Sequence, residues 1–289
     1  MLKKFFKYQS LGNDFILFDW YKKSENSIQK VLSQKSWNQF VVNSCNRNFG
    51  IGADGILILK TNLELQIPEA LIFNSDGTQA EICLNGLRSI NKHLFTYHNL
   101  EKEFQTKMGS KIIDCFTHSR HSHKALVPQG DRTILLKNNI EIINKIKSAE
   151  YIETRTIDIL GKKLIGHVID LGNPHFVIFE ETNLDWLKKH GHLLEKHKSF
   201  TNKTNVEFVW KDKKANHYNM LVYERGCGIT LACSSGVAST LWALFYLNKI
   251  KKEEKITIQM PGGQISCWID KNQKITLQST AQQVFKGSL

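Results

Sequence analysis

The sequence predicts an α/β (α+β) protein made of two copies of one unit, each a set of short strands around one apolar helix. The length of 289 residues accommodates two domains. Two strand-like segments joined by a Leu-Gly-Asn turn occur twice, with the turns at residues 11–13 and 171–173. A C-x-x-G motif that opens a helical apolar pattern also occurs twice, at residues 83–86 and 233–236. Such internal similarity predicts a duplicated fold.

Hydrophobic patterning predicts the remaining elements. After the first C-x-x-G motif, Leu87, Ile90 and Leu94 recur at helical spacing, and the second motif is followed in the same way. Short alternating or β-branched runs predict strands over residues 55–60, 71–74, 206–210, 219–223, 256–260 and 264–269. Polar and turn-forming residues over 117–139 predict the linker between the halves. The histidine tract at 118–124 is expected to be a solvated loop, because its spacing fits no tetrahedral metal site.

Composition excludes several classes of protein. The chain is 41% hydrophobic, which argues against disorder, and no apolar run approaches the ~20 residues of a membrane span. Lys7, Gln9 and Asn13 interrupt the N-terminal segment where a secretion signal needs apolar residues, so a cytoplasmic location is expected. The net charge of +12 would attract nucleic acid. However, the lysines are spread among glutamates and histidines, so neither nucleic acid nor a membrane is expected as a partner.

Residues 50–55 match the string G-x-G-x-x-G, which occurs in dinucleotide-binding proteins. In those proteins the glycines open a helix whose N-terminus holds the pyrophosphate. Here Ile56, Leu57 and Ile58 follow and predict a strand. We therefore expect neither a nicotinamide nor a flavin cofactor.

The six cysteines lie in a chain without a secretion signal, which predicts free thiols. Cys83 and Cys233 each lie at the start of a predicted helix, where the helix dipole favours the thiolate and the first N–H groups can bind a carboxylate. Two such thiols on opposite sides of one α-carbon could remove a proton from one face and return one to the other, which inverts the stereocentre. The other four are expected to be buried small hydrophobes: Cys45, Cys115, Cys227 and Cys267.

Together these motifs resemble those of the diaminopimelate epimerase family. The resemblance runs nearly from end to end and is specific in combination, through residues 11–15, 46–55, 73–77, 83–88, 172–175, 205–206, 223–226, 232–233 and 261–263. It implies two pseudo-symmetric domains, each a curved, mainly antiparallel sheet around a central helix, with the active site in the interdomain cleft. The domains would be residues 1–128, to which residues 277–289 return, and residues 129–276.

The resemblance also implies a function. Cys83 and Cys233 would be the acid/base pair that epimerises L,L-2,6-diaminopimelate to the meso form without a cofactor or metal, for lysine and peptidoglycan precursors. His175 and Glu224 match positions that tune the thiols. The matching substrate-binding positions are Asn13, Asn74, Leu84, Asn85, Asn173, Asn205, Glu224, Arg225, Ser234 and Ser235. The partner would be the small-molecule substrate, and a homodimer stays open.

Four positions depart from the family pattern. Leu84 and Ser234 stand where the family usually has glycine, Ile229 stands where it has glutamate, and Gly55 stands where some members place a glutamine. These changes leave open an altered rate or a different substrate. The alternatives are a racemase for another amino acid, such as histidine, on the same fold, and a basic nucleic-acid-binding module. A proline racemase would also use two cysteines but would not need the residues for a second amino-acid end.

Overall fold

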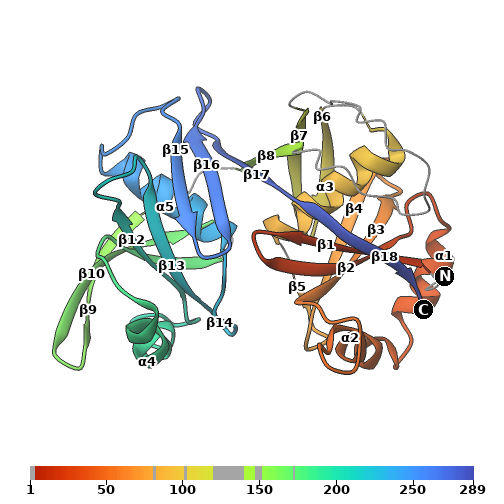
Figure 1. The fold of residues 1–289 in the computed structure, drawn as a ribbon, viewed down its shortest axis with the longest axis horizontal. Coiled ribbons are helices and arrows are strands. Elements are labelled where there is room, and N and C mark those ends of the chain that lie inside the picture. The colour runs from red at the N-terminus through yellow and green to blue at the C-terminus, as the bar shows by residue number, and fades with distance from the viewer. Residues whose placement is uncertain (1–3, 81–82, 101–102, 120–139, 147–151, 172) are drawn as a thin grey trace, which may run out of the picture. The chain divides into compact units, whose positions relative to one another are not determined.

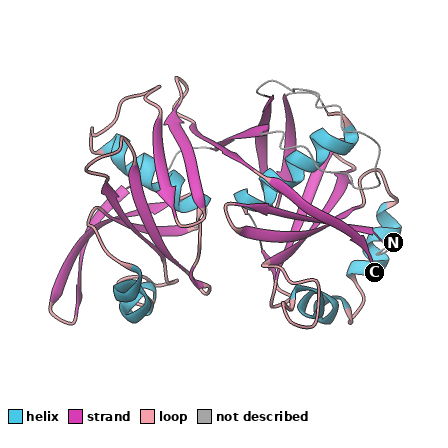
Figure 2. Cartoon of the chain, in the orientation of Figure 1, coloured by secondary structure: helices cyan, strands magenta, loops and turns pink. Residues whose placement is uncertain are grey.

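The computed structural model describes residues 4–80, 83–100, 103–119, 140–146, 152–171 and 173–289. The chain divides into two compact units: unit 1 is residues 1–144 with 279–289, and unit 2 is residues 145–278. Each unit combines many strands with few helices (Figure 2), which confirms the predicted α+β class and the duplication. The predicted boundary at residue 128 and most of the histidine tract lie outside the described residues.

Unit 1 begins and ends with strands that pair with each other. The C-terminal strand β18 (Gln282–Ser288) runs antiparallel to the N-terminal strand β1 (Lys4–Ser10) (Figure 1). The other elements are β2 (Asn13–Asp19), α1 (Glu25–Leu32), α2 (Trp37–Cys45), β3 (Gly55–Asn62), β4 (Ile67–Asn74), β5 (Gln79–Ala80), α3 (Leu84–His98), β6 (Glu103–Met108) and β7 (Lys111–Ser119). Residues 50–55 lead into β3 and not into a helix, as the sequence predicts.

Unit 2 follows a similar order of elements. They are β9 (Ile152–Ile159), β10 (Lys162–Asp170), β11 (Pro174–Ile178), α4 (Leu184–Glu195), β12 (Asn205–Lys211), β13 (Tyr218–Glu224), β14 (Gly228–Ile229), α5 (Ser234–Tyr246), β15 (Ile256–Met260) and β16 (Gly263–Ile269). Unit 2 has the additional strand β9 before β10, and it has one helix, α4, where unit 1 has α1 and α2. Strands β8 (Ile140–Ile146) and β17 (Ile275–Thr280) carry the chain from one unit to the other.

The strand pairing is the same in both units. The series β1–β2–β3–β4 pairs antiparallel, parallel and antiparallel, and so does β10–β11–β12–β13. Strand β4 then pairs antiparallel with β5 and parallel with β6, and β13 pairs in the same way with β14 and β15. The predicted repeat is therefore a repeat of topology, and residues of the paired strands in one unit have equivalents in the other.

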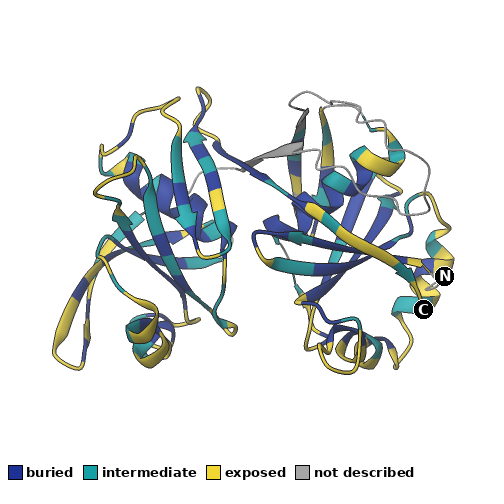
Figure 3. Cartoon of the chain, in the orientation of Figure 1, coloured by how far each residue is buried: buried dark blue, intermediate teal, exposed yellow. Residues whose placement is uncertain are grey.

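Both faces of the middle strands β3 and β12 are covered by other elements. Side chains alternate between the two faces of a strand, so neighbouring residues pack against different elements. In β3, Ile56 and Ile58 pack with the cluster formed around α1 and α2, and Leu57 faces the first turn of α3. In β12, Val206 and Phe208 pack with the cluster around α4. Figure 3 shows that most of α3 and α5 is buried. Helices α3 and α5 are therefore the core helices that the C-x-x-G motifs predict, whereas α1, α2 and α4 were not predicted.

Among the helices that the structure describes, none combines the length and the apolar character that crossing a lipid bilayer requires.

The buried strand β3 offers a direct test of this core. Ile58 is fully buried, whereas Ile112 on β7 of the same unit is 49% exposed. We expect Ile58→Ala to lower the free energy of unfolding by about 2–5 kcal/mol, because it leaves a cavity, and Ile112→Ala to lower it by about 1 kcal/mol or less. Urea denaturation followed by circular dichroism measures both values, and equal losses would contradict this account of the core.

Candidate functional site

Both predicted catalytic cysteines cap a helix in the same way. Cys83 (φ −147°, ψ 109°) and Cys233 (φ −126°, ψ 106°) are the N-cap residues of α3 and α5, one position before the first helical residue. In each case the thiol sulfur accepts the N–H of the glycine three residues later, Gly86 or Gly236, at 3.4 Å. Each sulfur therefore lies against the first-turn N–H groups and the positive end of the helix dipole.

In unit 1 the predicted residues gather at one edge of the sheet. The Cys83 thiol donates to Asn13 Oδ1 at 3.7 Å, and Asn85 Nδ2 donates to the same oxygen at 3.4 Å. Asn13 begins β2, and Asn74 ends β4 opposite Gly55, the first residue of β3. The starts of two parallel strands and the end of their antiparallel neighbour thus place Asn13 and Asn74 at one end of the sheet, where Asn13 contacts the cap of α3.

A buried cation lies close to Cys83. Arg88 is fully buried in α3, and its Nη1 donates to Asn85 Oδ1 at 2.5 Å and to Ser10 Oγ at 3.3 Å. Burial lowers the pKa of the Arg88 guanidinium to about 10, while the Cys83 thiol acts in the opposite direction. Arg88 is therefore still a cation at neutral pH, and a nearby cation favours the thiolate form of a cysteine.

Four charged side chains hold the turn that carries Asn13. Asp14 lies 2.7 Å from Lys7 Nζ and 2.7 Å from Arg47 Nη2, and Arg47 Nη2 also lies 2.7 Å from Asp54. Asp54 accepts from Asn13 Nδ2 at 2.8 Å. Burial alone would raise the pKa of the Asp14 carboxyl, but hydrogen bonds from Arg47 and Lys7 outweigh burial and lower it to about 2. This cluster fixes the position of the Asn13 side chain.

The equivalent edge of unit 2 carries the other predicted residues. Asn173 Nδ2 donates to Ser235 Oγ at 3.3 Å, next to the cap of α5. Asn205 is 4% exposed, donates through Nδ2 to Pro174 O at 2.8 Å, and accepts the backbone N–H of Arg225 at 2.9 Å. Asn205 thus connects the start of β11 to the turn after β13 through hydrogen bonds. The Arg225 residue itself is exposed.

The surroundings of Cys233 are acidic. Burial raises the pKa of the Cys233 thiol well above its usual range, and the carboxylates of Glu224 and Glu207 raise it further. Burial also raises the pKa of Glu224, and a hydrogen bond from Thr230 opposes that effect. Glu207 is fully buried and accepts from Nδ1 of the fully buried His175 at 2.7 Å. Cys233 therefore favours the protonated form.

Sequence reasoning did not single out Glu207 or Arg88. Glu207 is the one charged residue within residues 206–210, and a lone charge in an apolar strand is a sign that could have been noticed. Its partner His175 is far away in sequence and is brought near by the parallel pairing of β11 and β12, in which Val177 lies opposite Glu207. Arg88 lies among apolar residues of α3, and only the fold shows that it is buried.

Two of the four departures from the family pattern, Leu84 and Gly55, have local explanations. Leu84 is the first residue of α3 and has no positive φ, so the helix does not require glycine there. At Gly55 a Cβ atom would lie 2.5 Å from the backbone oxygen of Phe73, so this backbone has no room for a glutamine. Ile229 lies in β14, where it pairs with Tyr223.

The prediction that the four remaining cysteines are buried is wrong for Cys227. Cys45, Cys115 and Cys267 are buried, as predicted, but Cys227 is exposed. It lies in the turn between β13 and β14, flanked by Gly226 and Gly228 at φ 79° and 80°. The tight turn directs this segment toward solvent, which the sequence pattern alone did not show.

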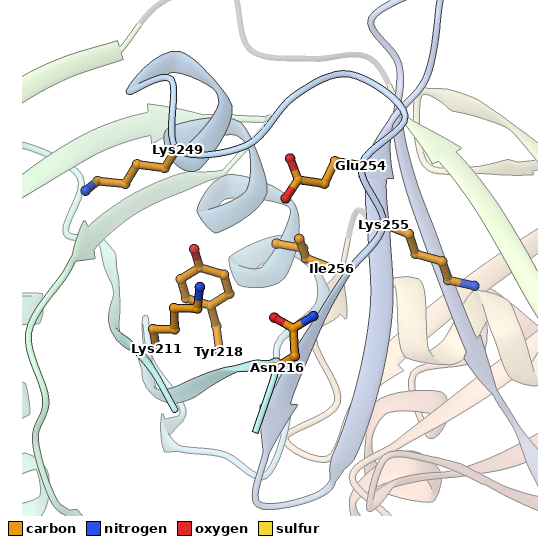
Figure 4. A pocket seen from close by; sticks show the side chains of 7 residues that line it. All are labelled: Lys211, Asn216, Tyr218, Lys249, Glu254, Lys255 and Ile256. Atoms are coloured by element: carbon orange, nitrogen blue, oxygen red, sulfur yellow. The ribbon is translucent and has the colours of Figure 1, made fainter. Parts of the chain in front are cut away.

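Metal-binding types of side chain also meet away from the cysteines. His93 Nε2 and His98 Nε2 lie 3.1 Å and 2.8 Å from Asp19 Oδ2 in unit 1. Both histidines are already hydrogen-bonded to Asp19, so an ion would have to replace those contacts. In unit 2 a polar hollow lies at the far ends of β12 and β13 from Cys233, lined by Lys211, Tyr218 and others (Figure 4). None of the predicted site residues lines it.

Comparison with known proteins identifies the family. A family model described as diaminopimelate epimerase matches residues 167–284. The diaminopimelate epimerase of Prochlorococcus marinus (strain NATL1A) is 33% identical over 300 residues, covering 100% of this chain and 99% of the relative. The chain belongs to the diaminopimelate epimerase family. A second such epimerase, from Trichodesmium erythraeum (strain IMS101), is 32% identical over 292 residues and 99% of each chain. The predicted enzyme class, an isomerase, is confirmed.

Solved structures of related folds extend the comparison. A PhzF-family phenazine biosynthesis protein from Bacillus anthracis has a TM-score of 0.67 at 11% identity, covering 99% of this chain and 98% of that one. A hydroxyproline epimerase from Agrobacterium vitis with bound trans-4-hydroxy-L-proline has a TM-score of 0.65 at 7% identity, covering 99% and 92%. At these identities the likeness shows a shared fold and nothing more specific.

The Asp14 cluster predicts a pH dependence of stability. Because the folded pKa of about 2 lies below the ordinary 3.8, ionised Asp14 stabilises the fold above pH ~4, and this stabilisation is lost as the pH falls toward 2. We expect Asp14→Asn to lower the urea midpoint at pH 6 and to differ progressively less from the wild type between pH 4 and pH 2. Asp158→Asn, at an exposed carboxylate of β9, is the control. A difference that does not change with pH would contradict the ion-pair account.

Proposed function

We propose that the protein epimerises L,L-2,6-diaminopimelate to the meso form without a cofactor, a step toward lysine and peptidoglycan precursors. Cys83 and Cys233 are the acid and the base. The observation that carries the proposal is the repeated cap, which places a thiol at the same position of two equivalent helices. The names of the relatives, diaminopimelate epimerase at 33% and 32% identity, support the choice of substrate.

The two helix starts bind the carboxylate at the reacting centre. Backbone N–H groups of Leu84, Asn85, Ser234 and Ser235 lie in the first turns of α3 and α5, where a helix favours an anion. Negative charge moves onto this carboxylate as the α-proton leaves. Donors already aimed at it therefore stabilise the transition state more than the substrate.

The thiols exchange roles in each turnover. A thiolate removes the α-proton from one face and becomes a thiol, while the other thiol gives its proton to the opposite face and becomes a thiolate. Protons balance, and no electron acceptor is needed. The Arg88 cation beside Cys83 supports a thiolate at that position.

The non-reacting end of the substrate is a second amino-acid group. The exposed guanidinium of Arg225 can hold its carboxylate by a two-point contact, and Glu224 with asparagine oxygens can accept from its ammonium. Asn74 and Asn205 stand at strand ends, and Asn173 contacts Ser235 in the first turn of α5. This set distinguishes the proposal from a racemase of a simple amino acid.

We expect Cys83→Ala and Cys233→Ala each to abolish epimerisation while the protein still folds, because inversion needs an acid and a base at once. Exchange of solvent deuterium into diaminopimelate measures the activity, and circular dichroism checks the fold. Cys115→Ala and Cys267→Ala remove buried thiols of the same size from units 1 and 2 and should remain active. Substantial turnover in either catalytic variant would refute the two-base mechanism.

We expect Arg225→Lys to lower kcat/KM for diaminopimelate by about tenfold or more, at ~1.4 kcal/mol per factor of ten. Lysine keeps the charge but loses the two-point contact with a carboxylate. The same assay run on a panel of amino acids that lack the second end gives the control. These should be poor substrates and should respond little to the substitution. Efficient racemisation of one of them, histidine included, with diaminopimelate left unchanged, would replace the proposal with the racemase alternative.

A further inference from the structure

Unit 2 contains a buried histidine–carboxylate pair beneath the start of α5. His175 on β11 and Glu207 on β12 have no exposed surface, and His175 Nδ1 lies 2.7 Å from Glu207 Oε1. A ring nitrogen of His175, a carboxylate oxygen of Glu207 and Cys233 Sγ all lie within 4.8 Å of one another. The pair therefore lies in direct reach of the Cys233 thiol.

The equivalent layer of unit 1 is apolar. Because β2 and β3 pair in the register of β11 and β12, Phe15 is the equivalent of His175, and Leu57 is the equivalent of Glu207. Leu57 lies under Gly86 as Glu207 lies under Gly236: a Cβ on either glycine would meet the residue below it at 2.9 Å or 2.7 Å. The same backbone thus packs well over an apolar pair, and the fold itself does not require buried charges.

Each residue of the pair also has one polar atom left without a hydrogen bond within the described part of the chain. Within the part of the chain that the structure describes, His175 Nε2 and Glu207 Oε2 are buried and have no hydrogen-bond partner. A carboxylate can only accept, so His175 must carry its proton on Nδ1 when it bonds to Glu207. This leaves Nε2 as the nitrogen whose lone pair is available.

We propose that Glu207 is a positioning residue for Cys233: its carboxylate fixes the tautomer and orientation of His175 and supplies a negative charge that keeps the proton on the Cys233 thiol. The proposal rests on the function proposed above, in which Cys233 must act as an acid in one direction of the reaction. The groups facing Cys233 are Glu224 at the end of β13, Glu207 on β12, His175 on β11, and the Ser235 hydroxyl and Gly236 N–H of α5. Of these, Glu207 is the one that bonds to His175.

The test replaces the charge and keeps the shape. In Glu207→Gln, the pH at which Cys233 becomes half ionised should fall by about one unit or more, since a like charge within a few ångströms is removed. The rate of reaction with methyl methanethiosulfonate, measured across pH and read peptide by peptide by mass spectrometry, reports this midpoint without any turnover. Glu69→Gln is the matched control, because Glu69 is a carboxylate of unit 1 that is 7% exposed and contacts Asn62, Lys60 and Lys107.

Activity supplies the second readout. In Glu207→Gln, the pH at which kcat/KM for diaminopimelate falls on the alkaline side should decrease by as much as the Cys233 midpoint does. A purely structural role would instead lower kcat/KM at every pH and leave the shape of the pH profile unchanged. If the glutamine variant does not fold, Glu207→Leu, which copies the residue of unit 1, repeats the measurement. An unchanged Cys233 midpoint in a folded variant overturns the proposal. A wild type that ignores diaminopimelate overturns the proposed function instead, and the thiol titration still decides the role of Glu207.

Discussion

The hydrogen bond from a glycine N–H to the thiol of the capping cysteine is the contact on which the site depends in both units. It exists only because the first turn of each core helix lies directly on the middle strand below it. Gly86 and Gly236 have no space for a side chain, since Leu57 and Glu207 occupy it. A larger residue at either glycine would force the side chain below it or the first helical turn to move, and a moved turn would cost the sulfur its hydrogen bond.

The two units keep this geometry and differ in the charges around it. Cys83 has the buried Arg88 cation nearby, and Cys233 has the carboxylates of Glu224 and Glu207. The charges nearest the two thiols are thus of opposite sign, and a cation favours a thiolate whereas an anion favours a thiol. Duplication therefore accounts for the equal geometry, and a few different residues around each cap account for the unequal charges.

The parts of this fold that the sequence predicts are those with a local pattern. The helical spacing of Leu87, Ile90 and Leu94 and the two Leu-Gly-Asn turns are visible within a few residues, and they lead to both core helices and both capping cysteines. Helices α1, α2 and α4 were missed because they are shorter, at 8, 9 and 12 residues against 15 and 13 for α3 and α5, and so offer fewer turns of apolar spacing to recognise. Cys227 was misjudged because its exposure depends on a turn between two glycines with positive φ.

What the sequence could not give is the partner of a residue distant along the chain. Glu207 is the one charged residue in its part of the strand, but its role depends on the parallel pairing that brings it against His175. Parallel strands are joined by long connections, so local residue spacing does not reveal which residues they bring together. Burying such a pair costs desolvation that an apolar pair of similar volume would avoid, as Phe15 and Leu57 show within the same molecule. Since the fold is satisfied without these charges, the reason for their presence has to be sought at the nearest reactive group, which is the Cys233 thiol.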